Sequence, residues 1–244
     1  MFELILLGIF VGVVSGFFGI GGGTILVPVL LITGFDMKTA IGVSVVQMVF
    51  SSIYGSYLNN KKGTLDIVMV ATIGVGGFIG AQLSGSVTSN VNDKTLEMVF
   101  LAFAIFALLR LFVKTRESQD KKETSKILLF IIGFFIGAIS MSVGVGGSLI
   151  LVPILVGFFG VPLKNATSAG LFFVVFSSVS GLLSHSIEGH VDYQSGVAIG
   201  LASLLGVYTG VHLKHKVDSV LQKRLLSAFY LTIVAYLTYR IMGA

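Results

Sequence analysis

Long apolar runs, separated by short polar turns, fill nearly the whole chain. The main runs are 2–18, 39–58, 65–87, 95–113, 127–143, 165–184, 193–213 and 221–242. Periodicity cannot separate helix from strand in such runs, but their length favours helix. Because a membrane-spanning helix needs roughly 17–25 apolar residues, the pattern predicts an all-α polytopic membrane protein.

The composition supports the same class. Only 11% of the residues are charged and 55% are hydrophobic, whereas a soluble domain carries about 25% charged residues to form its water-facing surface. The chain has no Cys, which excludes structural disulfides and thiolate metal sites. Its net charge of +5 fits basic loops beside anionic lipid headgroups, and nothing in it requires nucleic acid.

The chain contains two copies of one unit. When residues 8–30 are aligned with residues 133–155, more than half of the positions are identical, including glycines, a serine and a proline. With one inserted residue the match continues, so that 50–66 meets 176–192. Apolar bias alone does not align glycine, serine, proline and aspartate, so we interpret the pattern as an internal repeat.

Each copy opens with an apolar segment that a glycine-rich break interrupts. The breaks are 19–23 (GIGGG) and 144–148 (GVGGS), and a short apolar arm follows each of them. We predict that residues 1–113 form repeat 1 and residues 127–244 repeat 2 of a single membrane domain. The charged stretch 114–126 between them is predicted to be a solvated linker.

The orientation of the second copy depends on how the segment that contains each break lies in the membrane. Either the chain continues across the membrane at the break, or it turns back there. Passing through gives parallel copies, whereas turning back gives each copy an odd number of crossings and inverts the second. Cytoplasmic loops collect Lys and Arg, and only the turning-back arrangement gathers most of the 16 Lys and Arg on one side. We therefore predict two inverted-topology repeats, each a glycine-broken helical hairpin followed by three transmembrane helices. The linker is then cytoplasmic and both termini lie outside.

Inverted repeats with broken helices hold their substrate near the membrane midplane, where the breaks meet. A helix that begins at a break presents free N–H groups and a partial positive charge of about half a unit. Glycine amides and nearby hydroxyls can then bind an anion without a charged side chain. The candidate substrate-binding residues are Ser15, Gly19, Gly21, Gly22, Gly23, Thr24, Gln47, Ser140, Gly144, Gly146, Gly147 and Ser148.

These features also have a purely structural interpretation. Glycines in membrane helices allow close packing, and buried serines often bond the carbonyl one turn back. Gln47 is the sharpest candidate, because an amide at midspan needs a polar partner. Packing and binding both remain open for each break taken alone, and the matched pair of breaks favours a site.

The sequence gives little support for a metal site, a cation carrier or an enzyme. The four His form two groups, and the membrane segment between them places the groups on opposite sides, so we interpret them as surface residues and predict no metal site. No acidic or basic residue lies in the middle of an apolar segment, unlike in many proton or sodium carriers. The sequence contains no pattern of a nucleophile and a base that would indicate an enzyme, and no cofactor is expected.

The break and its arm form a doubled motif, GIGGGTILVP at 19–28 and GVGGSLILVP at 144–153. This motif resembles the sulfite exporter TauE/SafE family of bacterial membrane proteins, and the resemblance covers the whole chain. It implies transport of sulfur-containing oxyanions or organosulfonates, such as sulfite or sulfoacetate, across the bacterial inner membrane.

We therefore expect a secondary transporter of small sulfur-containing anions, held at midplane by the two breaks. Its expected partners are a small inorganic or organic anion and the lipid bilayer of the bacterial inner membrane, and its oligomeric state is left open. An anion channel and a non-transporting membrane scaffold are the alternatives.

Overall fold

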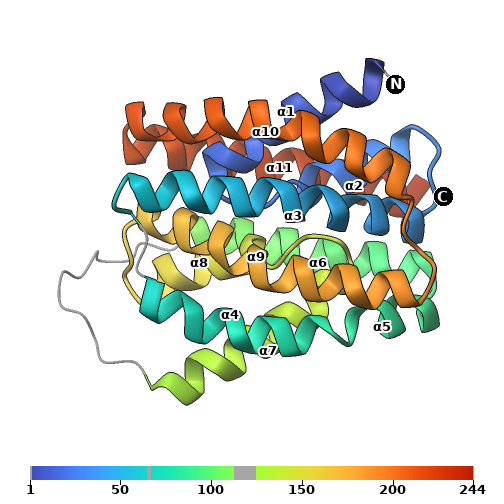
Figure 1. Cartoon of the computed structure of the whole chain (residues 1–244), viewed down its shortest axis with the longest axis horizontal. Coiled ribbons are helices and arrows are strands. Elements are labelled where there is room, and N and C mark those ends of the chain that lie inside the picture. Colours follow the sequence, from blue (N-terminus) through green and yellow to red (C-terminus); the bar gives the residue numbers. More distant parts are fainter. Residues whose placement is uncertain (1, 65–66, 113–124, 244) are drawn as a thin grey trace.

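A computed structural model of the chain describes residues 2–64, 67–112 and 125–243, which are almost entirely helical (Figure 1). The helices of the first half are α1 (Phe2–Phe18), α2 (Gly23–Ile32), α3 (Met37–Lys61), α4 (Ile67–Ala81), α5 (Ser84–Asn90) and α6 (Asp93–Phe112). Those of the second half are α7 (Lys126–Ser142), α8 (Ser148–Phe158), α9 (Leu163–Ile187), α10 (Tyr193–Lys216) and α11 (Ser219–Gly243). The all-helical prediction is confirmed. The predicted linker 114–126 lies outside the described residues except at its C-terminal end.

Within the described residues, five helical segments are long and apolar enough to cross a membrane. They are Met37–Lys61, Val70–Asn90, Leu163–Ile187, Tyr193–Lys216 and Ser219–Met242. Many large apolar side chains on the helices are exposed, Leu205 and Ile187 among them. Such a surface is suited to lipid, and the chain is a multi-pass membrane protein.

The apolar run predicted at 65–87 is divided in two. Its described part forms α4 and α5, which meet at Gln82 and Leu83. Two serines of α9 bond the backbone freed there, because Ser180 Oγ donates to Phe78 O at 2.6 Å and Ser184 Oγ donates to Gln82 O at 2.7 Å. Broken backbone is tolerated in a membrane when a neighbouring helix supplies such bonds.

The first helix of each half packs closely on a helix of the other half. A Cβ added to Gly12 of α1 would lie 2.1 Å from Ser203 O of α10, and one added to Gly137 of α7 would lie 2.3 Å from Gly77 O of α4. Backbones at this separation admit no side chain, so these glycines serve helix packing. For them the structural interpretation of glycine is the right one.

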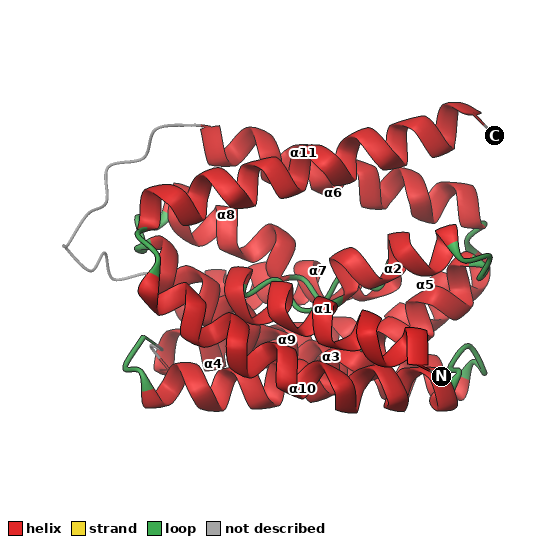
Figure 2. Ribbon diagram, turned by 90° about the horizontal axis from the view of Figure 1, so that it is seen from above, coloured by secondary structure: helices red, strands yellow, loops and turns green. Residues whose placement is uncertain are grey.

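The two arms extend in opposite directions from the middle of the molecule. In Figure 2, α2 returns towards the end that carries both chain termini, whereas α8 lies towards the other end. The chain therefore turns back at both breaks and does not run on through them.

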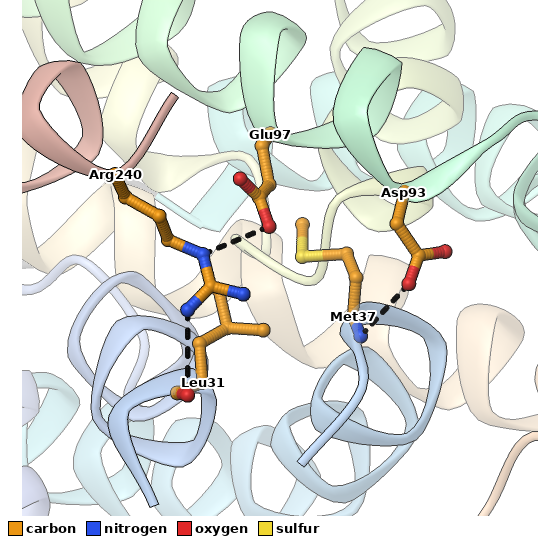
Figure 3. A network of polar contacts seen from close by, with 5 residues as sticks. All are labelled: Leu31, Met37, Asp93, Glu97 and Arg240. Carbon is orange, nitrogen blue, oxygen red and sulfur yellow. Dashed lines mark hydrogen bonds and ion pairs between the residues drawn. The ribbon is translucent and has the colours of Figure 1, made fainter. Parts of the chain in front are cut away.

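Polar contacts with α6 and α11 hold the far end of the α2 arm (Figure 3). Arg240 of α11 donates from Nε to Glu97 Oε1 of α6 at 3.0 Å and from Nη1 to Leu31 O at 3.4 Å. Nearby, Met37 N at the start of α3 donates to Asp93 Oδ2 at 3.3 Å. These bonds satisfy a carbonyl at the end of α2 and an amide at the start of α3. They hold in place the end of the arm that follows the first break.

Candidate functional site

The two glycine breaks meet in the middle of the molecule, between α3 and α9. A Cβ added to Gly23 would lie 1.9 Å from Gly144 O, so the backbones of the two breaks touch. Gly21 and Gly146 both face the same two side chains, Met48 of α3 and Val174 of α9. The structure thus brings together two segments that are more than 100 residues apart in the sequence.

Equivalent glycines set the shape of the two breaks. Gly19 has φ +67° and Gly144 has φ +70°, a conformation that L side chains rarely adopt. A Cβ on Gly19 would also lie 2.0 Å from Thr167 O of α9, and one on Gly144 would lie 3.0 Å from Ile41 Cα of α3. Both helices therefore end by turning sharply beside a helix of the other half.

Each arm begins with the same pair of backbone hydrogen bonds, although Gly22 has φ −68° and Gly147 has φ +84°. Gly22 O accepts from Ile25 N and Leu26 N at the start of α2, and Gly147 O accepts the corresponding bonds at the start of α8. The preceding amides have no such partner, as is usual at a helix start. Among the described residues, the N–H groups of Gly23 and Thr24 donate no backbone hydrogen bond, nor does that of Ser148. Two helix N-termini with free donors are therefore buried at the centre of the protein.

The hydroxyls predicted for the site are buried and have no partner. Ser15 and Thr24 of the first half, and Ser140 and Ser148 of the second, are all 0% exposed. The Oγ or Oγ1 atom of each makes no hydrogen bond in the described structure. Because buried polar atoms are nearly always paired in native proteins, four unpaired hydroxyls on the helices that flank the breaks are an unusual concentration of free donors.

Gln47 of α3 is also buried without hydrogen-bond partners in the described part of the chain, and here two polar atoms are unpaired. Its side chain is 0% exposed, and neither Oε1 nor Nε2 has a partner among the described residues. A Cβ on Gly22 would lie 1.9 Å from Oε1, so the amide lies directly against the first break. Phe173 of α9 stands in the same relation to Gly147, at 2.4 Å. One break is thus covered by an amide and the other by an aromatic ring.

Two further serines belong to this region and were missing from the predicted set. Ser44 Oγ of α3 donates to Gly144 O at 3.0 Å, and Ser177 Oγ of α9 donates to Gly146 O at 3.1 Å. They bond carbonyls of the second break and so offset negative partial charge beside the helix N-termini. Their spacing on apolar helices suggests a polar face, but no sequence feature indicates which backbone group they reach.

Two polar residues are placed differently from the prediction. His185 is 0% exposed, with Nε2 3.2 Å from Met141 O, so the interpretation of the histidines as surface residues is wrong at this position. Lys214, which the charge count assigned to a loop, is a fully buried residue of α10. Helix α10 extends to Lys216, beyond the predicted end at 213, and carries this lysine against α3 and α9.

The comparisons with known proteins agree with a transporter. The sequence profile of the sulfite exporter TauE/SafE family matches residues 4–237. The chain belongs to this family. Its TauE/SafE relatives include the "Probable membrane transporter protein YdhB" of Bacillus subtilis, which is 27% identical over 237 residues, 94% of this chain and 95% of the relative.

Other relatives extend the range of organisms. The "Probable membrane transporter protein MJ0441" of Methanocaldococcus jannaschii is 28% identical over 84% of this chain and 80% of its own. The "Sulfite exporter TauE/SafE family protein 5" of Arabidopsis thaliana is 30% identical over 42% of this chain and 23% of its own. No solved structure matches the chain. The family and the relatives' names identify a TauE/SafE membrane transporter.

Proposed function

We propose that this transporter carries small sulfur-containing anions, of the sulfite or organosulfonate class, and binds them where the two breaks meet. One observation carries the proposal: two helix N-termini lie buried together among unpaired side-chain donors. Thr24 is the second residue of α2 and Ser148 the first residue of α8, and their hydroxyls are unpaired within the described residues. The amide of Gln47 lies against Gly22, directly before α2.

An oxyanion suits these groups. A helix N-terminus favours negative charge, and a buried site strengthens that preference because water does not screen it. An oxyanion with three oxygens also offers enough acceptors for several hydroxyl and amide donors at once. Two carbonyls that a cation could use are already bonded, because Ser44 donates to Gly144 O and Ser177 donates to Gly146 O.

The proposal includes the inverted relation of the halves, residues 1–113 and 127–244, in the bacterial inner membrane. The opposite directions of α2 and α8 support it, as does the packing of α1 on α10 and of α7 on α4. The linker 114–126 would then face the cytoplasm. Since the chain has no Cys, a single cysteine placed in the linker tests this directly. It should react with a membrane-impermeant maleimide only in inside-out vesicles, and reaction in intact cells would refute the assigned orientation.

Transport itself is tested in proteoliposomes with radiolabelled sulfite and small sulfonates. We expect saturable uptake by the wild type and at least a tenfold loss in the double variant Thr24→Val, Ser148→Ala. The matched control is Ser203→Ala, which removes a buried hydroxyl bonded to Gly200 O at the α1–α10 contact. Equal uptake by all three proteins would refute the site. Non-saturable, channel-like currents would refute a carrier, and the absence of flux with every anion would favour a scaffold.

A further inference from the structure

A second cluster of buried polar groups surrounds Lys214, where the last turns of α3 and α10 meet the first turns of α9. The Lys214 side chain is 0% exposed and comes from the last turns of α10. Among the described residues, no carboxylate forms an ion pair with Lys214. Arg240 and Glu97 form an ion pair, but they belong to α11 and α6. A buried charge without a counter-charge is costly, so this position calls for an explanation.

The hydrogen bonds of the cluster leave an excess of donors. Lys214 Nζ donates to Asn59 Oδ1 at 2.6 Å and to Ser168 Oγ at 2.9 Å, which uses two of its three N–H bonds. Lysine cannot accept, so its contact fixes which end of the Asn59 amide is the oxygen. Asn59 Nδ2 is then a donor, and it is buried without a partner.

The charged groups around the cluster are also positive. Lys164 at the start of α9 acts on Lys214 by like-charge repulsion, and Lys62 and Lys164 both act on His215. Lys62, at the end of α3, is exposed to solvent. A group of cations at one end of a membrane protein attracts anions from the adjoining solution.

The cluster adjoins the first break. Ser168 follows Thr167, whose carbonyl lies 2.0 Å from the position of a Cβ on Gly19. The Lys214 cluster and the paired breaks therefore share α9, and an anion bound at one lies near the other along the same helix.

We infer that Lys214 and Asn59 form a second anion-binding station, distinct from the paired breaks and specific for a small oxyanion. One oxygen of the ligand accepts from Lys214 Nζ and another from Asn59 Nδ2, which supplies both the missing negative charge and the missing acceptor. The station holds the anion at the cationic end of the protein, next to the break that receives or releases it.

The test uses the full chain in neutral detergent, with sulfite or sulfate replacing gluconate at constant ionic strength. It is done in a Gln47→Leu background, which weakens the breaks and isolates the station. We expect either oxyanion to raise the melting temperature, and Lys214→Met to weaken the apparent affinity at least tenfold. Lys164→Met, which removes a neighbouring cation that has no such role, should change it less than threefold.

The variant Asn59→Asp covers the case in which Lys214→Met does not fold. Its carboxylate supplies Lys214 with an internal counter-charge, so the ligand-free protein should melt at a higher temperature and lose its response to oxyanions. A full response in Asn59→Asp or Lys214→Met would overturn the station. So would stabilisation by phosphatidylglycerol in nanodiscs but not by soluble oxyanions, which would identify a lipid headgroup instead. The proposed function is judged separately, by uptake through Thr24 and Ser148 variants with Lys214 intact.

Discussion

Replacing Gln47 with Leu should make the empty protein more stable and its substrate binding weaker. Both polar atoms of the Gln47 side chain are buried without partners. An unsatisfied buried group costs about 1–3 kcal/mol, and an apolar side chain of similar size removes that cost. We therefore expect the free energy of unfolding to rise by about 1–3 kcal/mol, which corresponds to a melting temperature higher by about 2–4 °C for each kcal/mol.

Binding should change in the opposite direction. A hydrogen bond to a charged ligand contributes about 1.5–3 kcal/mol, so its loss weakens affinity by about 10- to 150-fold. The assay measures melting temperature and sulfite affinity on the same purified variant, together with the KM for uptake in proteoliposomes. Met48→Leu is the matched control, because Met48 faces the same breaks, is equally buried and offers no hydrogen-bond donor.

The two readouts together discriminate between binding and packing. If Gln47 only fills space, Gln47→Leu and Met48→Leu should behave alike, with small changes in stability and none in affinity. A Gln47→Leu protein that is less stable than the wild type would show that the amide has a structural partner, and the reasoning from unpaired donors would then be refuted.

Three further predictions concern other parts of the structure. Gly19→Ala should destabilise the protein by about 1–3 kcal/mol, because a Cβ at φ +67° would lie 2.0 Å from a carbonyl of α9; an unchanged melting temperature would contradict this. Arg240→Gln should cost about 1–2 kcal/mol in chemical unfolding by leaving Glu97, with a side chain only 10% exposed, without its ion pair; Glu97→Gln in the same protein should recover part of the loss. The pKa of Glu188 is lowered from 4.5 by hydrogen bonds from two serine hydroxyls of α5. The stability that these bonds contribute is therefore present above pH 4.5 and is lost as the pH falls through the lowered pKa; Glu188→Gln should remove this dependence, and identical pH profiles would refute it.

Most of the helices, and the meeting of the two breaks, were predictable from the sequence. The apolar run 2–18 coincides with α1, and the arms begin at Gly23 and Ser148, within one residue of the predicted positions. Length and glycine content predict these features because they act locally. The repeat predicts two equivalent breaks, and the inverted arrangement of the copies predicts that the breaks meet. Gly23 and Gly144 are in contact, as that arrangement requires.

Polar contacts between distant helices were not predictable in the same way. Lys214 directly follows the apolar run 193–213, a place where lysine usually reaches solvent, and only the fold shows that it bonds Asn59 and Ser168. The division between α4 and α5 has a similar origin, because the serines that stabilise it belong to α9. His185 likewise directly follows an apolar run, and its contact with Met141 O of α7 has no signal in the sequence.

The central claim is that backbone amides at the two breaks, with neighbouring hydroxyls, bind the transported anion. The most direct test is a crystal structure with selenite, whose selenium is located by anomalous scattering. We expect a peak within hydrogen-bonding reach of Thr24 and Ser148 that is lost in the Thr24→Val, Ser148→Ala variant. Selenium bound only elsewhere on the protein, with the two breaks packed against each other as they are without ligand, would contradict the account.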